Sequence, residues 1–323
     1  MGRQWGADVA AAPALFPKGA GLRPLTPGGP AFVLVDGASH RSLGGVLAWA
    51  LRHRAGQVHL LVDASDEVAA VLARRAQPFT LPVAVWRVDP PTLRAVLPAG
   101  FLPSPALPGE AASFADVLRG AGVEPVVEFG LLTGEVLGLE VARVVVDRDG
   151  ARLEVGVGSQ DRQAHRDLEP NRPAEEQLAE VVAMIRRFRT PGGSAHLANS
   201  LGRERWLRRV VVARPELVGA AWLAPMPAAV PRGDLRTPTA AMAAGVDAAG
   251  RPVVVATSTG IDLDLVPAAA DARRASGLAD ARLILAMPPA DDHPRTRQLA
   301  ALLQEPAQVV AVPAGWKDLT GTL

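Results

Sequence analysis

The chain has 323 residues, of which 49% are hydrophobic and 21% are charged, and its formal net charge is +1. This length allows one large domain or two smaller ones with a sizeable core, and the near-neutral balance excludes a molecule-wide field that would attract nucleic acid or a membrane surface. The absence of cysteine excludes disulfides, thiolate catalysis and cysteine-ligated metal sites.

The first 30 residues are rich in glycine, alanine and proline and show no period, which predicts a flexible arm. They lack the basic start and the apolar core of a signal peptide. No apolar run in the chain reaches the ~18 residues that a membrane helix needs. We therefore expect a cytoplasmic protein without a membrane partner.

Residues 31–89 predict a β-α-β-α-β module. Short apolar runs indicate buried strands, and the segments between them carry apolar residues at helical spacing. Ser65 is a predicted helix N-cap, because Asp66 and Glu67 follow it in the first turn. Short connections favour a parallel sheet. The expected strands are Ala31–Asp36, Val58–Asp63 and Val83–Val88, and the expected helices are Ser42–Arg54 and Ser65–Arg75.

A proline-rich linker and a middle α+β domain are predicted next. Six prolines mark residues 90–109 as the linker, and the domain is expected over residues 110–224. Apolar residues at helical spacing make the segment from Pro173 strongly amphipathic. The expected elements are a helix at Glu110–Gly120, a strand at Val123–Glu128, an acidic hairpin within Gly134–Arg162, and helices at Pro173–Arg189 and His196–Ala213.

The end of the chain predicts a second α/β module. A linker at residues 225–239 leads into residues 240–323, where strands at Val253–Thr257, Arg282–Met287 and Val309–Val312 alternate with helices at Asp262–Ala275 and Pro294–Gln304. The pattern Val-Asp-x-x-Gly precedes an apolar strand both at residues 146–150 and at residues 246–250. We therefore predict an α/β fold in which two related β-α-β-α-β modules flank the middle hairpin and helices.

The acidic hairpin resembles the core of the PD-(D/E)XK nucleases, the restriction-endonuclease-like family. Gly138-Leu139-Glu140-Val141 stands where that family places its first metal-binding acid, and Glu154-Val155-Gly156 stands where it places Glu-x-Lys. Glu128 stands for the acid that often comes from the preceding element. The resemblance covers about residues 110–190, and it implies Mg²⁺ or Mn²⁺ on these three glutamates, with metal-activated water attacking a phosphodiester.

Two departures separate this hairpin from an active nuclease. Glycine replaces the lysine at position 156, and Arg162 is the nearest cation. Counted from a turn at Asp149, Glu140 and Glu154 are offset along the strands by roughly 13 Å, which is too far to share a metal ion.

The length of the hairpin loop decides which face each glutamate occupies. A three-residue loop puts Glu140 and Glu154 on one face, whereas a two- or four-residue loop puts them on opposite faces, and the four-residue loop sets Arg143 opposite Glu154. The alternatives are a structural cross-strand ion pair, a degenerate nuclease site, and another ligand site in the space that Gly156 and Gly158 leave beside Glu154.

A basic cluster between residues 186 and 209 is the second candidate site. It holds seven arginines, together with His196 and Trp206, against one acid, Glu204. Arginine suits phosphate because its planar fork binds two oxygens, so the cluster predicts a DNA- or RNA-binding surface. The alternative is a solvated helical face, because cations also favour helix C-termini. The residues assigned to nucleic acid are Arg186, Arg187, Arg203, Arg205 and Arg208.

Asp262 and Asp264 are a third candidate site, because they follow a predicted strand at the edge where open α/β sheets bind ligands. Asp36–His40 occupies the equivalent place in the first module. Both aspartates also suit the first turn of a helix, which is the structural alternative. Neither loop carries a nucleotide-binding fingerprint.

These features lead to two main hypotheses. The first is a cytoplasmic nuclease-like protein that has lost catalysis and contacts DNA or RNA. The alternative is a non-enzymatic scaffold, a homo-oligomer or a protein-binding subunit built from duplicated α/β modules. A third reading is an enzyme that uses Glu140, Glu154 or the aspartates, and it requires Mg²⁺ or Mn²⁺ if the hairpin is the active site.

Overall fold

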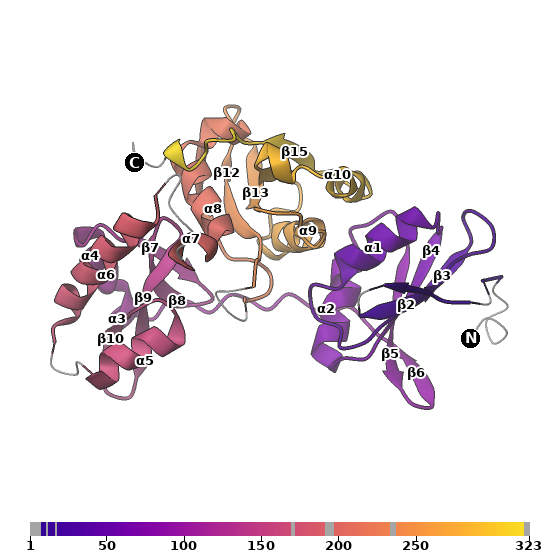
Figure 1. Ribbon diagram of the computed structural model, residues 1–323, viewed down its shortest axis with the longest axis horizontal. Helices are drawn as coiled ribbons and strands as arrows, with labels where there is room; N and C mark the ends of the chain where they lie inside the picture. Colours follow the sequence, from indigo (N-terminus) through magenta and orange to yellow (C-terminus); the bar gives the residue numbers. More distant parts are fainter. Residues whose placement is uncertain are drawn as a thin grey trace. The chain divides into compact units, whose positions relative to one another are not determined.

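A computed structural model of the chain describes residues 8–10, 12–16, 18–168, 172–190, 197–232 and 237–319. The described residues form helices and three β-sheets, which confirms the predicted α/β class (Figure 1). They divide into two compact units. Unit 1 contains residues 1–101, 261–279 and 292–309, and unit 2 contains residues 102–260, 280–291 and 310–323.

Unit 1 contains a six-stranded sheet with the order β1-β2-β3-β4-β5-β6. The strands β3, β4 and β5 are parallel, and the others are antiparallel to their neighbours. Both crossover helices, α1 and α2, lie on one face of the sheet (Figure 1). The elements are β1 (Ala14–Phe16), β2 (Gly19–Leu22), β3 (Pro30–Val35), α1 (Leu43–Arg52), β4 (Gln57–Val62), α2 (Asp66–Ala76), β5 (Val83–Asp89) and β6 (Thr92–Ala95).

Local sequence accounts for the two helices of this module. The Ser65 hydroxyl accepts a hydrogen bond from the Val68 amide, so Ser65 is the N-cap of α2 as predicted. In α1, the buried residues Leu43, Val46 and Leu47 follow helical spacing and face the sheet.

The flexible arm predicted for residues 1–30 is wrong over β1 and β2, which extend the sheet beyond β3. Val9 and Pro24 add an isolated bridge. The strands escaped prediction because β2 contains Gly19 and Gly21, which weaken the apolar pattern. A Cβ atom at Gly21 would lie 2.3 Å from the Trp49 ring of α1, so close helix packing requires glycine there.

The linker predicted for residues 90–109 is also wrong in part. After a cis Pro90–Pro91 bond the chain turns back as β6 and pairs with β5. Proline excluded this strand from the prediction, but prolines just before an edge strand do not break its hydrogen bonds.

Two further helices complete unit 1. They are α9 (Leu265–Ala275) and α10 (Pro294–Ala301), which come from the predicted C-terminal module. Helix α9 contacts α1 and α2, and α10 contacts α1 and α9. The helices of both predicted modules therefore pack together within one unit.

Unit 2 contains a four-stranded antiparallel sheet with the order β10-β9-β8-β7. One face of it packs against α6, whose buried residues Leu178, Val181, Val182 and Ile185 confirm the predicted amphipathic helix. The elements of this part are α3 (Gly109–Ala112), α4 (Phe114–Gly120), β7 (Glu124–Glu128), β8 (Leu131–Val136), β9 (Leu139–Asp147), β10 (Gly150–Val155), α5 (Gly158–Leu168), α6 (Ala174–Phe188) and α7 (Leu197–Ser200).

Unit 2 also holds most of a five-stranded sheet with the order β11-β12-β13-β14-β15. The buried residues Trp206, Leu207, Val210 and Val211 of α8 pack in one core with residues of β11, β12, β13 and β14. The elements are α8 (Arg203–Ala213), a 3-10 turn η1 (Pro215–Val218), β11 (Trp222–Met226), β12 (Ala241–Val246), β13 (Pro252–Thr257), β14 (Arg282–Met287), a 3-10 turn η2 (Pro289–Asp291) and β15 (Gln308–Ala311).

This sheet corrects two predicted boundaries. Helix α8 and strand β11 belong with the last sheet, although the middle domain was predicted to extend to residue 224. The predicted linker at 225–239 begins inside β11, where Pro225 is tolerated because β11 is an edge strand. The expected order β13, α9, β14, α10, β15 is confirmed, and the common origin of the two modules stays a prediction.

Among the described residues, no helix is both long enough and apolar enough to cross a lipid bilayer.

Candidate functional site

The antiparallel sheet of unit 2 carries a row of glutamates across three strands. Glu124 on β7 pairs with Glu135 on β8, and Glu135 pairs in turn with Glu140 on β9. Glu135 and Glu140 are each 2% exposed. Like charges that lie directly opposite one another in a sheet repel, so this row requires cations from elsewhere.

A β-bulge in β9 places Glu140 in this row. The register between β8 and β9 shifts after Gly134, so that Val141 is an extra residue between Glu140 and Ala142. Without the bulge, Glu140 would share the face of Ala142 and Val144, which belong to the apolar core. The bulge reverses the alternation and turns Glu140 to the opposite face.

The same bulge decides the relation between Glu140 and Glu154. The hairpin loop has two residues, because Asp147 pairs with Gly150, and Glu154 pairs with Arg143. Loop length alone predicts opposite faces for the two glutamates. Because Val141 adds one residue, both lie on the polar face with Arg143.

Five glutamates therefore share one face of the sheet, which we call the carboxylate face: Glu124, Glu128, Glu135, Glu140 and Glu154. Helix α8 approaches this face closely. At the turn before β9, Gly138 has a positive φ of 74°, and a Cβ atom there would lie 2.2 Å from the Trp206 amide nitrogen. Only glycine permits both the conformation and the approach.

Two arginines of α8 bind the centre of the carboxylate face. Arg208 donates to Glu128 at 2.8 Å and to Glu135 at 2.9 Å, and Arg205 donates to the same two carboxylates. The two arginines are three residues apart, so they project from the same side of the helix. Charge-assisted, fork-like hydrogen bonds of this kind are the strong ones in proteins.

This arrangement corrects the assignment of Arg205 and Arg208 to nucleic acid. Both residues are buried, with 8% and 2% of their surface exposed. Sequence reasoning placed them on a solvated or ligand-facing side of the helix because their acidic partners lie about 70 residues earlier in the chain. Glu135 was the missed residue, and its place opposite Glu140 depends on the bulge.

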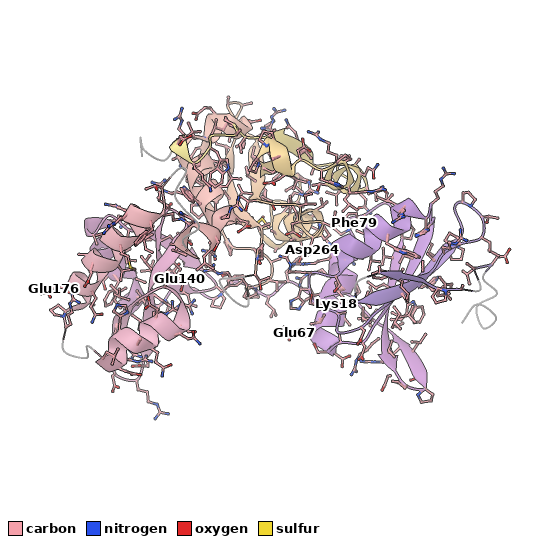
Figure 2. All side chains as sticks on the ribbon, viewed as in Figure 1. Lys18, Glu67, Phe79, Glu140, Glu176 and Asp264 are labelled. Carbon is pink, nitrogen blue, oxygen red and sulfur yellow. The ribbon has the colours of Figure 1, made fainter. Side chains whose placement is uncertain are left out.

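Glu140 has three arginine partners from three parts of the chain. Its carboxylate accepts from Arg143 at 2.9 Å, from Arg162 of α5 at 3.1 Å and from Arg232 at 2.6 Å. Figure 2 labels Glu140 on its strand within unit 2. Arg162, noted from the sequence as the nearest cation, is buried and serves as a structural partner.

Glu154 lies at the outer end of the face and has its own partners. It accepts from Arg166 of α5 at 2.7 Å and from Arg152 at 3.2 Å. Glu154 lies opposite Arg143 in the strand pairing, as predicted for the ion pair. The Arg143 side chain, however, donates to Glu140.

Burial and ion pairing move the pKa values of these groups in opposite directions. Burial by itself raises the pKa of Glu135, but the guanidinium groups of Arg205, Arg208 and Arg232 outweigh it and lower the pKa to about 2. Burial raises the pKa of Glu124, and the nearby Arg209 only partly opposes this. Glu135 is therefore a permanent anion at neutral pH.

The predicted metal set is not assembled in this arrangement. Glu128, Glu140 and Glu154 each bind arginines, and no group of three or more acidic or histidine side chains within the described residues is placed to hold a metal ion. Arginine occupies the positions around the carboxylates that a divalent cation would take.

The remaining residues of the basic cluster have different environments. Arg186 and Arg187 at the end of α6 are exposed, and Arg203 is half-buried. Arg189 is buried, donates to the carbonyl oxygens of Leu137 and Leu201, each at 2.8 Å, and stacks on Trp206. Burial lowers the pKa of Arg189 to about 10. The predicted His196 lies outside the described residues.

Asp262 and Asp264 belong to a second charged cluster, in unit 1. Asp264 precedes α9 and accepts from the Gly44 amide of α1 at 3.2 Å and from Arg75 of α2 at 3.1 Å (Figure 2). Arg75 also donates to the carbonyl oxygen of His40. Asp262 pairs with Arg41 at 3.0 Å. The two strand-end loops that the sequence marked as equivalent therefore meet within this unit.

Asp271 of α9 is a further acid of this cluster. It is 1% exposed and accepts from Arg74 at 2.9 Å and from Arg75 at 3.0 Å. Burial raises the pKa of Asp264 to about 7, although Arg75 opposes the rise. The cluster fits the structural alternative for both aspartates, which hold α1, α2 and α9 together.

Comparison with known proteins gives no relative. No protein-family model, no curated protein and no solved structure matches the chain.

We predict that Arg208→Met lowers the free energy of unfolding by about 3–5 kcal/mol, because it leaves Glu135 and Glu128 without one of their shared cations. Urea denaturation measures this change. Arg119→Met, in the exposed pair with Asp116, is the control and should change the free energy by less than about 0.5 kcal/mol. Equal, small effects of the two substitutions would contradict a central role for the buried pairs.

We also predict that Asp264 makes unit 1 more stable in mild acid than at neutral pH. With its pKa raised to about 7, folded Asp264 keeps a proton that the unfolded chain has lost. Stability therefore falls as pH rises from about 4 to about 7, by up to about 4 kcal/mol. Asp264→Asn should remove this slope in denaturation curves taken at a series of pH values. A slope of the same size in Asp264→Asn would refute the assignment.

Proposed function

We propose that the protein is a non-catalytic scaffold. In this proposal a nuclease-like middle domain has turned its carboxylates into structural ion pairs, and two related α/β modules pair with each other or with a protein partner. The observation that carries the proposal is the carboxylate face itself. Every glutamate on it is bound by at least one arginine, and the two central ones are almost fully buried.

The chemistry of this face favours a structural role. A metal-dependent hydrolase needs carboxylates that face an open site and that exchange ligands with water and substrate. Glu135 and Glu140 instead have charge-assisted hydrogen bonds from α8, α5 and Arg232, and these bonds join elements that are distant in the chain. Removing a partner exposes a buried charge, so these residues resist change for reasons of folding alone.

The helix packing in unit 1 supports the scaffold in a second way. Helices α1 and α2 of the first module contact α9, and the buried Asp271 binds both Arg74 and Arg75 of α2. The helices of the two modules therefore pack together within one chain. Duplicated modules in separate chains associate in the same way when they form homo-oligomers.

The test of this proposal is metal binding and cleavage. We expect calorimetric titration with Mn²⁺ to give no saturable heat, and we expect no cleavage of single- or double-stranded DNA or of RNA with Mg²⁺ or Mn²⁺. Glu140→Gln serves as the matched variant, because it removes a candidate metal ligand. Saturable Mn²⁺ binding or cleavage that Glu140→Gln abolishes would overturn the proposal.

Contact with nucleic acid is the second candidate function, and a groove in unit 2 favours it. Arg119 of α4, Arg186 of α6 and Arg209 of α8 line this groove, which has a volume of about 520 Å³. Three arginines from three helices around one groove can follow a phosphate backbone. Arg209 is paired with Glu124 at 3.0 Å, so Arg119 and the exposed Arg186 are the residues most open to a ligand.

We expect the double substitution Arg119→Ala and Arg186→Ala to weaken binding of a fluorescent oligonucleotide at low salt by roughly tenfold, with a smaller dependence of affinity on salt. Fluorescence anisotropy at several salt concentrations measures both changes. The double substitution Arg148→Ala and Arg251→Ala, at two exposed arginines, is the charge-matched control. No binding at low salt, or equal losses in the double variant and the control, would exclude this groove as the site.

A further inference from the structure

The centre of the carboxylate face carries more positive than negative charge. Three glutamates, Glu128, Glu135 and Glu140, are bound by five arginines. These are Arg143, Arg162, Arg205, Arg208 and Arg232. Arg162, Arg205 and Arg208 are buried, and Arg143 and Arg232 are half-buried. Unbalanced charge in a weakly polarisable interior is costly, and a bound anion is the usual way to offset it.

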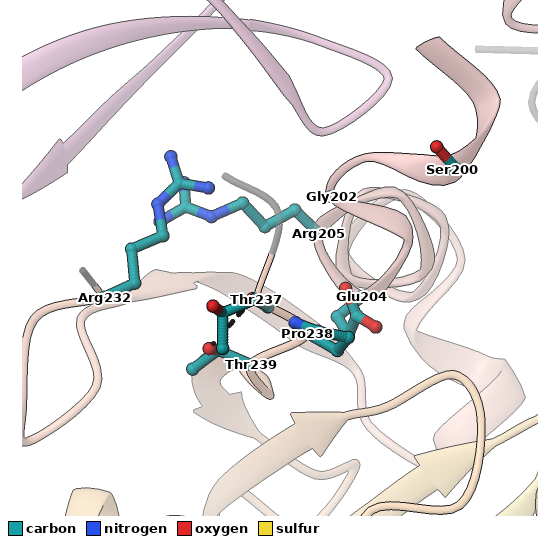
Figure 3. A pocket seen from close by; sticks show the side chains of 8 residues that line it. All are labelled: Ser200, Gly202, Glu204, Arg205, Arg232, Thr237, Pro238 and Thr239. Atoms are coloured by element: carbon teal, nitrogen blue, oxygen red, sulfur yellow. Dashed lines mark hydrogen bonds between the residues drawn. The ribbon is translucent and has the colours of Figure 1, made fainter. Parts of the chain in front are cut away.

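A small pocket, with a cavity volume of about 30 Å³, lies beside this charge excess. Arg205 and Arg232 line it together with the hydroxyl-bearing residues Ser200, Thr237 and Thr239. Figure 3 shows the guanidinium groups of Arg205 and Arg232 converging at one end of the pocket. A second pocket, also of about 30 Å³, shares Arg205, Arg232 and Thr239 with the first, so the two adjoin.

Arg232 has more hydrogen-bond donors than its bond to Glu140 uses. A guanidinium carries five N–H donors, and within the described part of the chain Arg232 donates one hydrogen bond, to Glu140 at 2.6 Å. Its side chain is 19% exposed, which leaves little water to satisfy the others. Arg205 lies close enough to lower the pKa of Arg232, after burial itself. An anion in the pocket would further offset these two like charges, which Glu140, Glu135 and Glu128 already offset in part.

The acids around the pocket do not fill this need. Glu204 lines the first pocket, but its carboxylate accepts a hydrogen bond from the Thr259 hydroxyl at 2.9 Å. Glu128 lines the second pocket and is already shared by Arg205 and Arg208. The first turn of α8, at Gly202, also borders the first pocket and has no side-chain cap, so its amide dipoles add to the positive potential.

We propose that this pocket binds a phosphate-type oxyanion between Arg205 and Arg232. A tetrahedral oxyanion has several acceptor oxygens, and two of them match the guanidinium fork of Arg232. The proposal is independent of the scaffold function, because it needs neither metal binding nor catalysis.

The first experiment measures binding of inorganic phosphate by isothermal titration calorimetry, with sodium chloride at matched ionic strength as the control. We expect saturable binding of phosphate, competition by sulfate and no effect of chloride. An identical response to phosphate and chloride would show a general salt effect and would overturn the proposal.

Two substitutions make the test specific. Glu140→Gln removes the acid that competes for Arg232, so phosphate should bind several-fold more tightly. The double substitution Glu140→Gln with Arg232→Ala removes both partners. The amide oxygen that replaces the carboxylate can still accept hydrogen bonds from Arg143 and Arg162, so the fold should persist while phosphate affinity falls at least roughly tenfold. Arg251→Ala, which removes an exposed arginine, is the control. Unchanged phosphate affinity in the double variant would overturn the proposal.

The source of the phosphate is tested with the same variants. A nucleoside monophosphate represents a terminal phosphate, and a short oligonucleotide without terminal phosphates represents a phosphodiester backbone. We expect the monophosphate to compete with inorganic phosphate and the oligonucleotide to compete at least tenfold less well, because a monoester is a dianion and fits an enclosed pocket. An oligonucleotide that binds equally well to the double variant would place nucleic acid elsewhere, and a failure of the monophosphate to compete would overturn the proposal.

Discussion

The position of Glu135 between Arg205 and Arg208 is the interaction on which unit 2 depends. Its carboxylate is almost fully buried and remains charged, which is tolerable only while α8 stays against the sheet. That requirement fixes the orientation of α8, whose other side supplies Trp206 and Val210 to the core of the last sheet. One ion cluster thus ties the antiparallel sheet to the five-stranded sheet.

Unit 1 is also held together by buried ion pairs between helices. There, one buried aspartate of α9, Asp271, binds the adjacent arginines Arg74 and Arg75, and Asp264 anchors the start of α1. In both units a helix with two nearby arginines docks on a buried acid that is distant in sequence. Such pairs add little net stability relative to an apolar contact, but they allow few alternative arrangements of the helices.

Much of the fold could be predicted because it depends on local patterns. Apolar runs and amphipathic spacing located β3, β4, β5, α2, α6 and the last module to within a few residues. The candidate site could not be predicted in this way, because its residues are joined by contacts between distant parts of the chain. Nothing near Arg205 in the chain indicates that Glu135 neutralises it. Counting residues from the hairpin turn could not predict the face that Glu140 occupies. The bulge residue, Val141, looks like any other apolar strand residue in the sequence. The strand β2 was hidden because its glycines serve the packing of Trp49.

The bulge at Val141 also limits how this chain can vary in length. Deleting Val141 would remove the bulge and return Glu140 to the face of Ala142, within the apolar core. Substitutions in β9 are therefore easier to accept than changes of length. Any relative that keeps this face must keep the spacing Glu-x₄-Glu, with Arg-x₂-Arg on the helix that covers it. That spacing is a signature by which distant relatives could be recognised when overall sequence similarity has vanished.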